Sequence, residues 1–183
     1  MATNVWISLL RGANVGGHNI GGKGQLVSLY ESLGYGDVRT HIQSGNVLFT
    51  SAVGDPGKLA RDIESALDKQ LGLRVSVILR TSIQLRATIA ANPFPAESEE
   101  NPSRVMVGFF DRTPLEDDIN NMKPLQCAPD KFRIVGAEVF CHFPNASGNS
   151  KLNSVYFEKQ LDVNLTMRNW RVVNKLLELA EEG

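Results

Sequence analysis

The amino-acid sequence predicts an α+β fold built from two subdomains. In the first half, short runs of β-branched and aromatic residues alternate with segments whose apolar residues recur at helical spacing. The breaker Asn92-Pro93-Phe94-Pro95 and a glutamate-rich stretch then interrupt this pattern, which partly repeats afterwards. The chain of 183 residues is long enough for one ordinary domain or two small ones.

Residues 1–92 predict one ferredoxin-like subdomain with a short connecting helix. The first strand is an apolar run, and the helix after it ends at Gly34. The next two strands join around Gly45, and Asp55-Pro56 opens the second helix. The order β-α-β-β-α-β is the split βαβ arrangement. We expect strands over 5–10, 38–42, 47–51 and 75–79, and helices over 26–33, 55–71 and 82–91.

Alternation along these strands predicts which face of the sheet the helices cover. We expect Ile7 and Leu9 on the covered face and Trp6, Ser8 and Leu10 on the opposite face. The opposite face is half polar, so two interpretations stay open. It either packs against the second subdomain or lines a ligand cleft between the subdomains.

Residues 103–183 predict a second subdomain that lacks its last strand. We expect strands over 104–110, 131–135 and 138–143, and helices over 114–122, 151–161 and 167–181. The last helix takes the place of a fourth strand, and Trp170 begins its apolar stripe, so Trp170 is expected in the core. Residues 93–102 are expected to be an exposed linker. The two halves share a plan without matching sequence.

Composition excludes several classes of protein. The net charge is −1 without a long basic tract, so nucleic-acid binding is not expected. Cys127 and Cys141 have neither metal-ligand spacing nor the number needed for a disulfide framework. No apolar run is long enough for a signal peptide or a membrane span. We therefore expect a cytoplasmic protein, a monomer or weak homodimer, with no metal, no cofactor and no membrane partner.

Two motif searches give negative results. Residues 17–24 nearly fit a phosphate-binding loop, but Gly24 stands where a magnesium-binding hydroxyl is needed. Backbone amides beside Lys23 could still hold an anion there. An RNA recognition motif would need stacking aromatics where this chain has Asn46 and Leu48.

Two expected helix starts carry cations in their first turns. Ser150 and Thr166 would be N-caps, followed by Lys151 and Arg168. A cation there opposes the helix dipole by about 0.3–1 kcal/mol. The pattern is explained either by an anion lying between the helices or by internal ion pairs with residues such as Asp162 or Glu158.

Six stretches together resemble the bacterial domain of unknown function 1697 family. They are LLRGANVGGHNI, LGYGDVRTHIQSGNVLFTS, NPFP, FRIVGAEVFCHFPN, SGNSKLNSVYFEKQL and TMRNWRVVNKLLELA. The resemblance covers nearly the whole chain in order. It implies a two-subdomain α/β protein related to ferredoxin-like folds, and it implies no activity.

The resemblance and the glycine-rich segment of residues 12–17, which follows the first expected strand, together supply the candidate ligand-binding residues. They are Arg11, Asn14, Gly16, Gly17, Gln43, Ser44, Asn46, Ser150, Lys151, Thr166, Arg168 and Asn169. The leading hypothesis is a protein that binds a small anionic ligand, bearing phosphate or carboxylate, between its subdomains. The alternative is a non-catalytic interaction or structural module whose polar residues join the subdomains. No residue is assigned a catalytic role.

Overall fold

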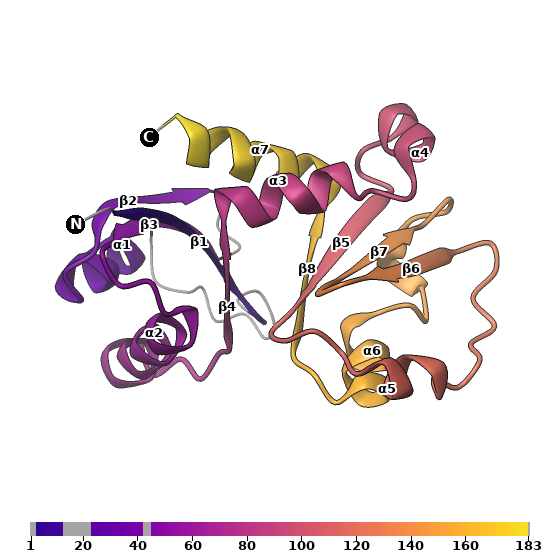
Figure 1. The fold of residues 1–183 in the computed structure, drawn as a ribbon, viewed down its shortest axis with the longest axis horizontal. Helices are drawn as coiled ribbons and strands as arrows, with labels where there is room; N and C mark the ends of the chain where they lie inside the picture. The colour runs from indigo at the N-terminus through magenta and orange to yellow at the C-terminus, as the bar shows by residue number, and fades with distance from the viewer. Residues whose placement is uncertain (1–2, 13–22, 42–44, 183) are drawn as a thin grey trace. The chain divides into compact units, whose positions relative to one another are not determined.

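The computed structural model describes residues 3–12, 23–41 and 45–182, in two compact units. The first unit consists of residues 1–86 and 176–183, and the second consists of residues 87–175. Figure 1 shows the helices and strands of both units. Among the described residues, no helix combines the length and the apolar character that crossing a membrane requires.

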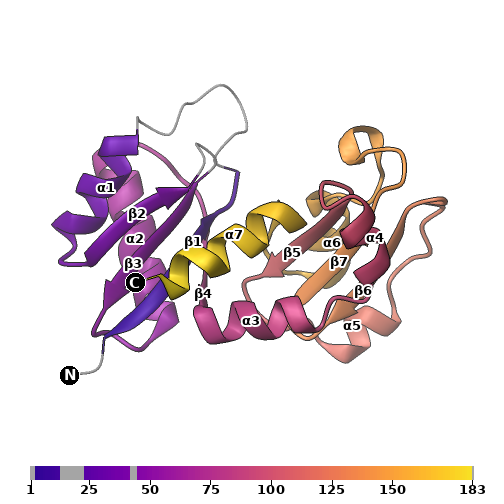
Figure 2. The same cartoon turned by 90° about the horizontal axis from the view of Figure 1, so that it is seen from above.

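The first unit is an antiparallel sheet with two helices packed on one face. Its strand order is β2-β3-β1-β4, and Figure 2 shows the strands side by side. The order along the chain is the predicted β-α-β-β-α-β. The elements are β1 (Asn4–Leu10), α1 (Lys23–Ser32), β2 (Gly36–His41), β3 (Asn46–Ser51), α2 (Pro56–Leu71) and β4 (Val77–Thr81), followed by α3 (Ser82–Ala90).

Local sequence determines where α2 begins and ends. The Asp55 carboxylate accepts a hydrogen bond from the Gly57 amide, and Pro56 stands at the first helical position. Gly72 ends the helix in the left-handed conformation, with φ of 65°. The helix buries Leu59 and Ile63 against the sheet, as its apolar spacing predicts.

Our prediction of which β1 side chains face the helices is wrong. Trp6 and Leu10 lie in the helix-covered core with Val47 and Phe49, whereas we expected Ile7 and Leu9 there. The reason is register: Trp6 pairs with Phe49, and directly paired residues share a face. The five residues from Trp6 to Leu10 are all buried, so burial does not alternate along this part of β1.

Ser8 also lies on the helix-covered face, where its hydroxyl meets that of Tyr30. The two oxygen atoms are 2.7 Å apart and both residues are fully buried. Burial raises the pKa of Tyr30 above its ordinary value, so this phenol stays protonated at neutral pH. Each hydroxyl is therefore the other's buried hydrogen-bond partner.

Replacing Ser8 with alanine is expected to destabilise the protein by about 1–3 kcal/mol, because the buried Tyr30 hydroxyl loses this partner. Urea unfolding followed by circular dichroism measures the loss. The double variant Ser8→Ala/Tyr30→Phe removes both polar groups and should recover part of it. An unchanged unfolding midpoint for Ser8→Ala would contradict this role.

The second unit contains the strand that we expected it to lack. Residues 165–169 form β8, which pairs with β5 and completes the order β6-β7-β5-β8. The α+β class in two subdomains is confirmed, but the second subdomain is complete. Its elements are α4 (Pro95–Glu100), β5 (Val105–Phe110), α5 (Glu116–Asn120), β6 (Lys131–Val135), β7 (Glu138–His142), α6 (Ser154–Leu161) and β8 (Leu165–Asn169). The last helix, α7 (Trp170–Glu181), begins in this unit, and its residues from 176 onward belong to the first unit.

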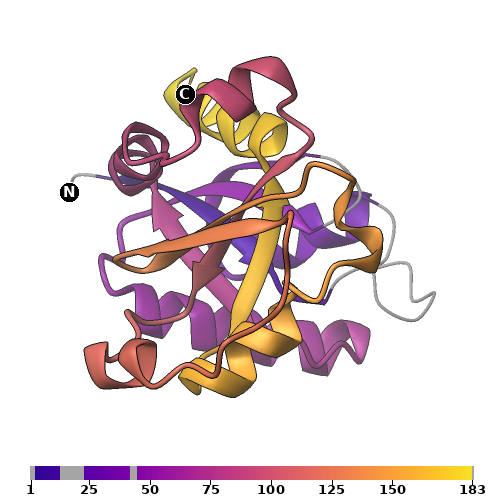
Figure 3. The ribbon, with the colours of Figure 1, turned by 90° about the vertical axis from the view of Figure 1, so that its right-hand side faces the viewer.

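Helices α5 and α6 lie together on one side of this second sheet (Figure 3). The core between them and the sheet contains Phe110, Val139 and Phe157. Pro95–Glu100, where we expected an exposed linker, form α4, and Phe94 before it is buried. Trp170 is only half-buried, contrary to our prediction, because β8 occupies the residues before it and α7 begins at Trp170 itself.

Candidate functional site

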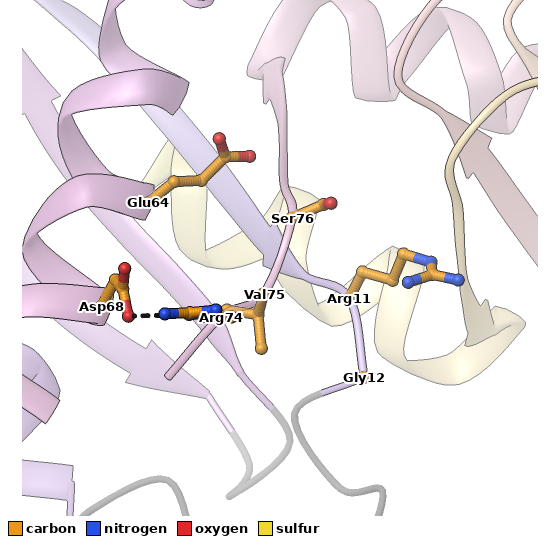
Figure 4. A pocket seen from close by; sticks show the side chains of 7 residues that line it. All are labelled: Arg11, Gly12, Glu64, Asp68, Arg74, Val75 and Ser76. Atoms are coloured by element: carbon orange, nitrogen blue, oxygen red, sulfur yellow. Dashed lines mark hydrogen bonds and ion pairs between the residues drawn. The ribbon is translucent and has the colours of Figure 1, made fainter. Parts of the chain in front are cut away.

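A depression of about 450 Å³ lies in the first unit where β1 ends. Arg11 and Gly12 follow β1, Glu64 and Asp68 project from α2, and residues 74–76 precede β4. Figure 4 shows the seven residues that line it. The lining combines two guanidinium groups with two carboxylates, so the depression carries no net charge of its own.

Both carboxylates that line the depression already have partners. The Asp68 carboxylate lies 3.4 Å from Nε of Arg74, and both side chains are largely exposed, so this ion pair contributes little to stability. Glu64 Oε1 accepts a hydrogen bond of 2.8 Å from the Val77 amide at the start of β4. In Figure 4 the Arg11 guanidinium points away from the Asp68–Arg74 pair.

The backbone at the end of β1 is held against the residue before β4. The Arg11 amide donates to the Ser76 carbonyl at 2.9 Å. Gly12 has φ of +73°, a left-handed conformation that favours glycine. Gly12 therefore turns the chain out of β1 where Arg11 lines the depression.

The structure describes some of the twelve candidate residues and not others. Asn14, Gly16, Gly17, Gln43 and Ser44 lie outside the described residues. Arg11 lines the depression. Asn46 is buried at the start of β3, where its side-chain amide donates to the His41 carbonyl at 3.0 Å. The contact joins the two strands of the hairpin.

The two expected helix starts are not helix starts. Ser150 precedes α6, and the N-cap of that helix is Asn153. The Ser150 hydroxyl donates to the Asp130 carboxylate at 2.6 Å. Lys151 next to it is exposed. Thr166 and Arg168 lie in β8, so the argument from helix dipoles does not apply to them. Asn169 caps α7 by accepting a hydrogen bond from the Val172 amide at 2.9 Å.

Arg168 is a buried cation in β8. Its Nη1 donates to the Thr166 hydroxyl at 2.7 Å and to the Met167 carbonyl at 2.8 Å. Burial lowers the pKa of Arg168 to about 10, so the guanidinium keeps its charge at neutral pH. These contacts are internal to the second unit.

Sequence reasoning missed four polar side chains of the depression. They are Glu64, Asp68, Arg74 and Ser76. The available signal was the spacing of Glu64 and Asp68, four residues apart on α2, which places both carboxylates on one side of that helix. The sequence does not show that this side meets the end of β1.

The fold and this depression define an α+β protein of two ferredoxin-like units, with a mixed-charge surface site in the first. The model described as a protein of unknown function (DUF1697) matches residues 3–140, and the chain belongs to this family. A comparison with curated proteins found no match.

A solved structure supports the fold. The chain resembles a conserved bacterial protein from Streptococcus pneumoniae with a TM-score of 0.72 and 22% sequence identity. The alignment covers 98% of this chain and 99% of the other. At this identity the likeness concerns the fold alone.

Proposed function

We propose that the protein binds a small ligand bearing an anionic group, phosphate or carboxylate, at the depression beside Arg11. The observation that carries this proposal is that Arg11 and the left-handed Gly12 line the same depression at the end of a central strand. A guanidinium can hold a carboxylate or phosphate through two parallel hydrogen bonds. The volume of about 450 Å³ lies in the range of small-molecule sites.

A second candidate function is the non-catalytic structural or interaction module. The roles of Ser150, Arg168 and Asn169 favour it, because each makes contacts within the second unit that support the fold. This candidate predicts that no small anion changes the stability of the protein.

We also propose that the protein acts in the bacterial cytoplasm. One observation supports the cytoplasmic location: both Cys127 and Cys141 are free thiols.

Replacing Arg11 with glutamine is expected to weaken anion binding by about 10- to 150-fold, which corresponds to a charge-assisted hydrogen bond of about 1.5–3 kcal/mol. The assay is a thermal-shift series with inorganic phosphate, sodium acetate and a set of phosphorylated and carboxylated metabolites. The wild type should gain melting temperature with at least one of them, because a ligand that binds only the folded state stabilises it.

Arg86→Gln is the matched control. Arg86 is exposed on α3 and pairs with Glu181, so this variant loses the same charge away from the depression. It should respond to the anions as the wild type does. A wild type that responds to no anion, or an Arg11→Gln variant that responds fully, would exclude this function.

A further inference from the structure

The two units have the same strand order, and the residues at the ends of their first strands are paired in the same way. In the first unit Leu10 pairs with Val77, and in the second Phe110 pairs with Leu165. Both sheets have the same order of strands, with the first strand of each unit between the third and the fourth. Residue 11 therefore corresponds to residue 111.

A repeated side-chain contact supports this correspondence. Glu64 on α2 accepts a hydrogen bond from the Val77 amide, the first residue of β4, at 2.8 Å. Glu158 on α6 accepts one from the Leu165 amide, the first residue of β8, also at 2.8 Å. In each unit the helix that precedes the last strand therefore holds the start of that strand in the same way.

The same backbone contact ends the first strand in both units. The Arg11 amide donates to the Ser76 carbonyl at 2.9 Å, and the Asp111 amide donates to the Asn164 carbonyl at 3.0 Å. Ser76 therefore corresponds to Asn164, because each stands one residue before the last strand.

The two units differ in the side chain of the residue that follows the first strand, Arg11 in the first unit and Asp111 in the second. In the second unit the Asp111 carboxylate accepts two hydrogen bonds from Asn164. Its Oδ1 lies 3.1 Å from the backbone nitrogen, and its Oδ2 lies 2.8 Å from the side-chain amide nitrogen. A carboxylate of the chain itself thus fills the position, with one oxygen on a backbone donor and the other on a side-chain donor.

In the first unit the donors remain but this carboxylate is missing. Arg11 stands where Asp111 stands, and a guanidinium accepts no hydrogen bond. Among the described residues, the Ser76 amide has no acceptor, and Ser76 lines the depression. Its hydroxyl is a side-chain donor in the place of the Asn164 amide.

We propose that Ser76 holds a carboxylate of the ligand, in the position that the Asp111 side chain fills in the second unit. One carboxylate oxygen accepts from the Ser76 amide and the other from its hydroxyl, and Arg11 supplies the positive charge. This inference rests on the proposed function and narrows its ligand from anions in general to carboxylates.

The first test introduces the Asp111–Asn164 contact of the second unit into the first unit. In the double variant Arg11→Asp/Ser76→Asn, the new aspartate should accept from the amide of residue 76. Hydrogen exchange followed by NMR should then show that amide exchanging about tenfold more slowly than in Arg11→Asn/Ser76→Asn, the matched pair without the carboxylate charge. Equal exchange in the two variants would overturn the proposal.

The second test uses free acetate and does not depend on the grafted pair. Acetate titrated into the wild type should shift the NMR signal of the Ser76 amide, and the shift should weaken in Ser76→Ala. Removing the internal carboxylate by Asp111→Ala should let acetate shift the Asn164 amide as well. No acetate effect at residue 76 in the wild type would overturn the proposal.

Inorganic phosphate distinguishes this proposal from the function on which it rests. If phosphate shifts the amides of Arg11 and Ser76 while acetate does not, the protein binds anions but the carboxylate assignment is wrong. If neither anion shifts any amide of the depression, the proposed function itself is wrong, and the carboxylate assignment fails with it.

Discussion

Replacing Phe49 with alanine is expected to lower the free energy of unfolding by about 3–5 kcal/mol. Phe49 is fully buried in β3 beneath the helices of the first unit. Its ring centroid lies 4.7 Å from that of Tyr35 and 5.3 Å from that of Tyr30. The variant loses the burial of the ring, leaves a cavity and removes both aromatic contacts. Urea unfolding followed by circular dichroism measures the change.

Two further variants separate these contributions. Phe49→Leu keeps much of the volume and loses only the aromatic contacts, so it should cost clearly less than Phe49→Ala. Ile83→Ala removes a large apolar side chain that is 75% exposed, and it should change stability by less than about 0.5 kcal/mol. A Phe49→Ala loss no larger than that of Ile83→Ala would show that Phe49 does not lie in the core.

Replacing Phe157 with alanine is expected to cost a similar amount, about 3–5 kcal/mol, in the second unit. Phe157 on α6 is fully buried, and its ring centroid lies 5.2 Å from that of Phe132 and 5.1 Å from that of Tyr156 in edge-to-face contacts. The ring connects α6 to the edge strand β6. Hydrogen exchange of the amides of residues 131–135, together with urea unfolding, measures the loss.

Val155→Ala is the matched control on the same helix. Val155 is 67% exposed, so its truncation should leave stability within about 0.5 kcal/mol of the wild type. If both α6 variants lower the unfolding midpoint equally, the loss reflects the helix itself rather than the packing of the Phe157 ring.

Much of the first unit could be predicted from sequence because its signals are local. Asp55, Pro56 and Gly72 define the two ends of α2 through contacts within a few residues. Val77 and Leu79 of β4 lie in the helix-covered core, as expected from side chains that alternate in direction along a strand. Such signals require no knowledge of the rest of the chain.

The prediction for β1 was wrong because its local signal is weak. Residues from Trp6 to Leu10 are buried on both sides of the sheet, so the sequence does not distinguish the faces. Pairing of Trp6 with Phe49 decides them. A strand that is buried on both faces takes its orientation from its neighbours.

The fourth strand of the second unit was missed for a related reason. Residues 165–169 include two polar side chains and an arginine, and the apolar stripe of α7 follows directly, so the segment reads as the start of a helix. Hydrogen bonding with β5 holds it as a strand, and the Arg168 side chain bonds within the strand. The expected helix-dipole site at Thr166 and Arg168 disappears with that correction. The one at Ser150 and Lys151 is wrong for another reason, because α6 begins at Ser154 with Asn153 as its N-cap.

For this protein the sequence by itself determined the α+β class, the two-part plan, the family and the importance of Arg11 as a candidate. Only the tertiary structure decided that Arg11 lines one depression with Ser76 and the α2 carboxylates, and that a chain carboxylate fills the corresponding place in the second unit. The physical reason is the range of the interactions. Caps and periodicity act over a few residues, whereas strand pairing brings together residues 11 and 76, whose sequence separation leaves no local signal of their contact.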